Sequence, residues 1–137
     1  MYSSSPFKGE GFYTTLCGRL NMRRVDNYLR LNGKYLEEAR FLLEKGDYVQ
    51  ASEKFWGAAA EIVKAVAARR GMDIKSHREF FEFVAKLKDE LNDSELPRLF
   101  SLASALHQNF YEDWLPPETV RDHGKAVEEL VKRLTVK

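Results

Sequence analysis

Cysteine, proline and long apolar runs are scarce in this sequence. Of its 137 residues, only Cys17 is a cysteine and four are prolines. A single thiol excludes an internal disulfide and a zinc site built from several thiolates, which is typical of a protein of the reducing cytoplasm. There is no secretory signal pattern, and no apolar run reaches the roughly 20 residues that span a bilayer. We therefore expect a cytoplasmic protein that does not enter a membrane.

An excess of charge of one sign is also missing. The chain has 22 lysines and arginines against 21 aspartates and glutamates, which gives a formal net charge of +1. Such a balance does not draw a whole protein onto nucleic acid or an anionic membrane, so any binding of that kind needs a local patch. With 44% hydrophobic residues, the chain is long enough for one packed domain.

Motifs of common catalytic and cofactor sites are absent too. The sequence has no glycine-rich phosphate loop, nucleophile elbow, Cys-x-x-Cys pair or His-Glu-x-x-His zinc motif. His107 and His123, with Glu112 or Asp113, lack the tight spacing of metal ligands. We expect no metal and no cofactor.

The sequence does contain apolar residues at helical spacing from Asp26 almost to its C-terminus. Residues 1–25 differ, because serines, Pro6 and scattered glycines interrupt any helical period there. We predict an irregular or flexible N-terminal arm over residues 1–25 and a helical-bundle domain over residues 26–137. The predicted fold class is all-α, an antiparallel up-and-down bundle of four to five helices.

Turn and capping residues mark the predicted helix ends. Gly46 and Gly71 stand where left-handed residues end helices. The spacings from Asp47 to Gln50 and from Ser76 to Glu79 are typical of capping boxes that begin the next helices. Gly57 lies within a helix, which predicts close approach of a neighbouring helix.

The most site-like segment is the run 106–114, which precedes two prolines. On a helix, Leu106 and Phe110 lie on the buried face, while an imidazole, a phenol and an indole line one flank beside it. This flank is where a bundle would form a groove. The ligand-binding residues predicted there are His107, Asn109, Tyr111 and Trp114.

Histidines of the last two helices are the candidate catalytic residues. His107 is one candidate for a general base, and His123, at the border of the apolar stripe of the last helix, is the other. His123 is placed to meet His107 across the bundle. The alternative is structural: His107 and Tyr111 tie their helix to a neighbour, and Trp114 fills the end of the bundle.

A basic group surrounds the predicted turn before the third helix. Backbone amides at a helix start receive phosphate, and nearby phenylalanines, among them Phe81, would add stacking faces for RNA or a nucleotide. The alternative is a set of cations that stabilise one helix end. The group contains Arg69, Arg70, Lys75, His77 and Arg78, of which Arg70, His77 and Arg78 are the predicted ligand-binding residues.

Three segments resemble the archaeal PaREP family, whose members are similar to HEPN helical bundles. They run from Ala51 to Ala60, over Ser76-His77 and from Leu106 to Glu112. The resemblance implies homodimerisation and, as partners, RNA, a nucleotide or a nucleotidyltransferase. HEPN RNases of toxin–antitoxin pairs, which need no metal, carry an arginine and a histidine four to six residues apart on one helix. Here a predicted helix break separates Arg70 from His77.

Three functions follow from this sequence. The first is a non-catalytic HEPN-like protein that binds RNA, a nucleotide or a protein partner in the groove beside His107. The second is an RNase, with His107 or His123 as base and an arginine from another helix or the dimer mate; its candidates are Arg69, Arg70 and Arg78. The third is an adaptor, because residues 35–60 resemble one tetratricopeptide hairpin.

Overall fold

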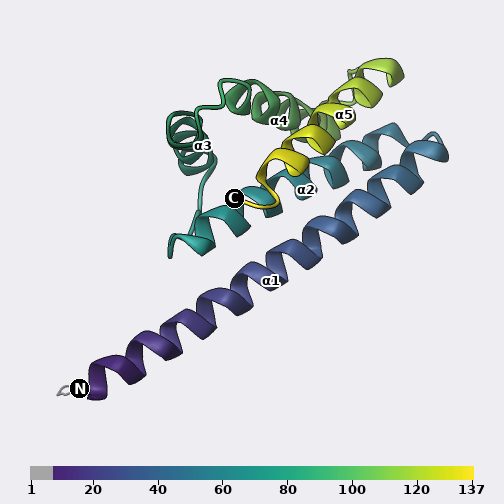
Figure 1. The fold of residues 1–137 in the computed structure, drawn as a ribbon. Coiled ribbons are helices and arrows are strands. Elements are labelled where there is room, and N and C mark those ends of the chain that lie inside the picture. Colours follow the sequence, from purple (N-terminus) through teal and green to yellow (C-terminus); the bar gives the residue numbers. More distant parts are fainter. Residues whose placement is uncertain (1–7) are drawn as a thin grey trace.

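Five helices joined by short links make up the fold, as Figure 1 shows for this computed structural model. The structure describes the backbone of residues 8–137 and the side chains from residue 18 onward. The predicted all-α class is confirmed. Within the described chain, no helix is long and apolar enough to cross a membrane. The helices are α1 (Lys8–Glu44), α2 (Tyr48–Arg69), α3 (His77–Leu91), α4 (Leu96–Glu112) and α5 (Pro117–Leu134).

The N-terminal part of the chain is helical rather than irregular from Lys8 onward. Helix α1 runs without a break for 37 residues, so the arm predicted over residues 1–25 is wrong for residues 8–25, while residues 1–7 lie outside the described part. Isolated glycines cost a helix only about 1 kcal/mol each, and no proline interrupts the segment. Figure 1 shows this end of α1 extending past the other helices, and from residue 18 onward Val25 is the first whose side chain is buried.

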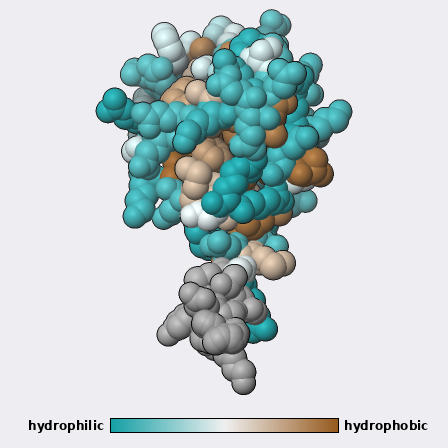
Figure 2. Space-filling view, turned by 60° about the vertical axis from the view of Figure 1, so that its left-hand side comes forward, coloured by the Kyte–Doolittle hydropathy of each residue, from teal (hydrophilic) through white to brown (hydrophobic). Residues whose placement is uncertain are grey.

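Helix α2 is the centre of the core. It packs against all four other helices, and it carries buried side chains on most of its faces. Small residues make this possible, since a β-carbon on Gly57 would lie 3.0 Å from the Cδ2 atom of Tyr35 in α1. The close helix approach predicted at Gly57 is therefore confirmed. Hydrophilic residues cover most of the outer face seen in Figure 2.

Local signals at the helix ends are confirmed. Gly46 and Gly71 have positive φ angles of 81° and 71°. The Asp47 side chain accepts a hydrogen bond from the Gln50 amide, and the Ser76 hydroxyl accepts one from the Glu79 amide. These bonds satisfy amides that a helix start leaves without a partner.

The C-terminal half combines a crossing helix with a hairpin. Figure 1 shows α3 nearly end-on while α1 and α2 run across the view, so α3 departs from the antiparallel arrangement. Helices α4 and α5 pack against each other and against α2. Helix α4 ends at Glu112 and is capped by Asp113, whose φ of 51° is left-handed, and Pro117 begins α5. The adaptor alternative rests on the α1–α2 hairpin, but α3 to α5 join its core rather than forming further stacked repeats.

Candidate functional site

Three rings from three helices meet beside the core. The Trp56 indole of α2 stacks on the His77 imidazole of α3, with centroids 5.3 Å apart and planes 4° apart. It also stacks on His107 of α4 at 5.1 Å, and the two imidazoles lie 5.3 Å apart. We call Trp56, His77 and His107 the ring cluster. Because each ring comes from a different helix, the cluster depends on the correct packing of all three.

A carboxylate orients one imidazole of the ring cluster. Glu53 Oε1 lies 2.9 Å from His107 Nδ1. If Nδ1 carries the proton, it donates to Glu53 and leaves Nε2 as an acceptor. Glu53 lies one turn before Trp56 on α2, so one helix supplies both the ring and the carboxylate that hold His107.

A groove of about 380 Å³ lies next to the ring cluster, between α1 and α3 with α2 as its floor. We call it the α1–α3 groove. Gly57, which has no side chain, and Ala60, which has a small one, form the floor. Tyr35 forms one wall, and Trp56 and His77 form the other. The remaining lining residues are Glu53, Lys54, Glu61, Lys64 and Phe80.

Both lysines of the α1–α3 groove are paired with carboxylates. Lys54 Nζ lies 2.9 Å from Glu38 Oε1, and Lys64 Nζ lies 3.2 Å from Glu61 Oε2. The adjacent ammonium group of Lys54 lowers the pKa of Glu38. Lys54 also lies 5.2 Å from the centre of the Tyr35 ring. These contacts hold each ammonium group beside a carboxylate, so the lining of the α1–α3 groove is close to neutral.

Comparison with known proteins identifies the family. Residues 27–131 match the archaeal PaREP1/PaREP8 family. This chain belongs to that family. The resemblance noted in the sequence is thereby confirmed. A crystal structure of a protein from Sulfolobus solfataricus is similar at 30% sequence identity and a TM-score of 0.69, with 77% of this chain and 93% of that chain covered. No match was found among curated proteins.

Asn109 of this PaREP1/PaREP8 protein faces its own fold rather than a ligand. The side chain is 1% exposed. Its Oδ1 accepts hydrogen bonds from the amides of Trp114 and Leu115, both at 2.8 Å, and its Nδ2 donates to Ser52 Oγ at 3.0 Å. The ligand-binding role predicted for Asn109 therefore gives way to a structural one: it joins α4, the α4–α5 turn and α2.

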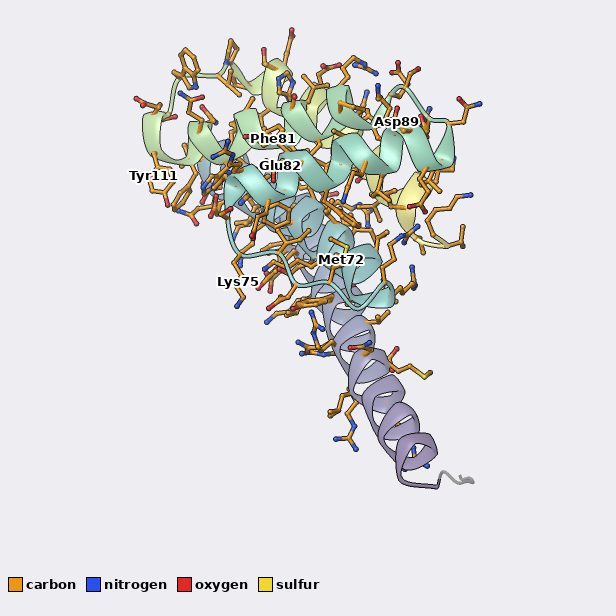
Figure 3. The ribbon with its side chains drawn as sticks, turned by 90° about the vertical axis from the view of Figure 1, so that its left-hand side faces the viewer. Met72, Lys75, Phe81, Glu82, Asp89 and Tyr111 are labelled. Atoms are coloured by element: carbon orange, nitrogen blue, oxygen red, sulfur yellow. The ribbon has the colours of Figure 1, made fainter. Side chains whose placement is uncertain are left out.

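The two exposed aromatic residues of the 106–114 run have different surroundings. Tyr111 is 72% exposed and meets the His107 ring edge-on at 5.4 Å, so it extends the ring cluster to the surface. Figure 3 shows it at the end of α4, on the same side of the view as Lys75. Trp114 is 61% exposed, and among the described rings it stacks on none.

The predicted arginines do not reach the ring cluster. Arg70 binds Glu90, whose pKa it lowers, together with the carbonyl oxygens of Val66 and Lys137. It lies 14 residues from Trp56 on α2, about 21 Å along the helix axis. Arg78 pairs with Glu82 at 3.4 Å, and its side chain is 87% exposed. Of the predicted basic group, only His77 enters the cluster.

His123 is separate from His107. The ring neighbours of His107 are Trp56, His77 and Tyr111, so the predicted meeting of His107 and His123 does not occur. His123 Nδ1 is buried and has no hydrogen-bond partner among the side chains from residue 18 onward, and a carboxylate oxygen of Asp122 lies 3.6 Å from it. Among the residues that the structure describes, no three histidine, cysteine or acidic side chains gather as metal ligands do.

Sequence reasoning missed the contributions of α2 to the site. Trp56 and Glu53 lie three residues apart, on one side of the apolar stripe that contains Phe55 and Ala59. The signal in the sequence that could have indicated this role was a tryptophan beside that stripe, followed directly by a glycine. The partners of Trp56 lie on α3 and α4, more than 20 residues away in the sequence, and no local pattern specifies them.

Proposed function

We propose that this PaREP1/PaREP8 protein binds a nucleobase, presented by a nucleotide or by single-stranded RNA, in the α1–α3 groove, and that it does so without cleaving its ligand. The observation that carries this proposal is the wall of the groove, where the exposed ring of His77 is backed by the stacked ring of Trp56. Bases stack on such faces with little regard to sequence.

The rest of the α1–α3 groove supports a flat, polar ligand. The small side chain of Ala60 leaves room between Tyr35 and His77, while the Tyr35 ring lies directly over Gly57. Carboxylates accept hydrogen bonds from base amino groups, and Glu53 stands at the groove with a side chain 33% exposed. Because Lys54 and Lys64 are already paired, the attraction to phosphate is weak. Stacking, rather than backbone charge, would supply most of the affinity.

The HEPN-like character, the homodimer and the nucleotidyltransferase partner stay predictions. A dimer fits this proposal if it adds a second base-binding groove and so raises the affinity for one RNA strand. Size-exclusion chromatography with light scattering measures the oligomeric state.

A tryptophan signal tests the base-binding proposal. The chain has two tryptophans, so Trp114→Phe leaves Trp56 as the only one. Titration with a single-stranded RNA of about eight nucleotides, a length within typical site sizes, is expected to quench Trp56 fluorescence. In this background, His77→Ala removes one stacking face and should weaken binding about tenfold.

Phe41→Ala is the matched control, because Phe41 is an exposed ring of α1, 58% accessible, that does not line the α1–α3 groove. It should leave the affinity for RNA unchanged. Equal affinities of the Trp114→Phe protein with and without His77→Ala would reject the groove as the binding site.

RNase activity is the second candidate function, and the pairing of His77 with His107 is the observation that favours it. His107, oriented by Glu53, would take the proton of a ribose 2′-hydroxyl through Nε2, and His77 would give a proton to the 5′-oxygen that leaves. This pair replaces the predicted pairing of a histidine with Arg69, Arg70 or Arg78.

The RNase alternative predicts RNA fragments with 2′,3′-cyclic phosphate ends, formed in the presence of EDTA. His77→Ala and His107→Ala should each abolish cleavage, whereas His123→Ala should not. Intact RNA after prolonged incubation with the wild-type protein would remove this alternative and leave the binding proposal in place.

A further inference from the structure

A second groove, of about 480 Å³, lies between α1 and α5. Both helices pack on α2, but their backbones stay apart, so a groove remains between them with Phe55 of α2 beneath it. We call this the α1–α5 groove. It shares no lining residue with the α1–α3 groove, and its lining residues are Arg40, Leu43, Glu44, Phe55, Arg121, Gly124, Lys125 and Glu128.

The floor of the α1–α5 groove is apolar. It consists of half-buried Leu43, the backbone of Gly124 and the small edge of the Phe55 ring that remains exposed, since Phe55 is 2% exposed. A β-carbon at Gly124 would come within 2.7 Å of Phe55 Cε2, so the glycine lets the ring lie directly against α5. Such a floor suits a hydrocarbon chain or an aromatic ring.

Two cations of the α1–α5 groove have no carboxylate partner among the described residues. Arg121 donates a hydrogen bond to the neutral Tyr48 hydroxyl at 2.8 Å and lies over the Tyr48 ring. Lys125 follows one helical turn later on α5. Arg40, by contrast, is paired with Glu128 at 2.8 Å. The uncompensated positive charge therefore lies on one side of the groove, along α5.

We infer that the α1–α5 groove binds a small amphipathic anion, with its carboxylate against Arg121 and Lys125 and its apolar body on Phe55 and Leu43. An arginine fork and an ammonium group are suited to one anionic head group. Glu44 and Glu128 also line the groove, and they disfavour ligands with several negative charges. The inference is independent of nucleobase binding in the α1–α3 groove.

The fluorescent anion 8-anilinonaphthalene-1-sulfonate is a direct probe of the full-length protein. It should bind with enhanced fluorescence, and decanoate should displace it while decanol, which has no charge, should not. Binding should weaken as salt is added. The double variant Arg121→Gln/Lys125→Gln should bind the probe at least fivefold more weakly.

Arg30→Gln/Lys132→Gln is the matched control, because both residues are exposed, lie outside the α1–α5 groove and change the net charge equally. It should bind the probe as the wild type does. Amide shifts on addition of decanoate to the wild type, measured by nuclear magnetic resonance, should concentrate at Leu43, Gly124 and Lys125. Equal weakening in both double variants, or shifts elsewhere, would overturn the inference.

Discussion

Replacing Asn109 by alanine is expected to lower the free energy of unfolding by about 3 kcal/mol. The amides of Trp114 and Leu115 would lose their acceptor, and Ser52 Oγ would lose the donor at 3.0 Å. The side chain is also fully enclosed, so its removal leaves a cavity. Urea unfolding followed by circular dichroism measures the change.

The neighbouring Gln108→Ala is the control, because Gln108 is exposed and a surface substitution usually changes stability by less than about 0.5 kcal/mol. Asn109→Asp keeps an acceptor for both turn amides and should retain more stability than alanine at neutral pH. Equal stabilities of the Asn109→Ala and Gln108→Ala variants would show that the α4–α5 turn does not depend on Asn109.

The second large effect is expected at Gly124, where alanine should lower the free energy of unfolding by about 2 kcal/mol. The new β-carbon would lie 2.7 Å from Phe55 Cε2 and 2.8 Å from Cζ. Phe55 is 2% exposed and packed in the core, so its ring can relieve the clash only by shifting toward the α1–α5 groove, at the expense of its core contacts. The clash outweighs the gain of about 1 kcal/mol that alanine brings to a helix.

Gly33→Ala is the matched control for Gly124→Ala. Gly33 also lies within a helix, but nothing would come within 4 Å of its β-carbon, so alanine should stabilise the protein by up to about 1 kcal/mol. In addition, Phe55→Leu shortens the clashing side chain and should make the Gly124→Ala change less costly. Strict additivity of these two substitutions would contradict a direct clash.

Much of the helical framework could be predicted from the sequence, because helix ends depend on local chemistry. Gly46 and Gly71 adopt the expected left-handed conformations, and Asp47 and Ser76 form the expected caps. The prediction failed for residues 8–25, where the penalties of the glycines were too small to interrupt α1. The sequence-based prediction gave these glycines a larger effect on helix formation than they have.

The candidate site was less predictable, because its contacts are long-range. Helical projection placed His107 beside Tyr111 correctly. Asn109 was also predicted to bind a ligand, although its amide is buried against Ser52 and the α4–α5 turn. A projection describes the face on which a side chain lies, but it does not describe what the next helix places against that face.

The run from Leu106 to Trp114 shows which features the sequence determines and which the tertiary structure determines. The sequence by itself determined an amphipathic helix with an aromatic flank that stops before two prolines, because helical period and proline geometry act over a few residues. Only the tertiary structure decided that His107 stacks on Trp56 and His77 rather than meeting His123. The physical reason is that packing around α2 brings α3 and α4 together, and helix packing depends on side chains far apart in the chain.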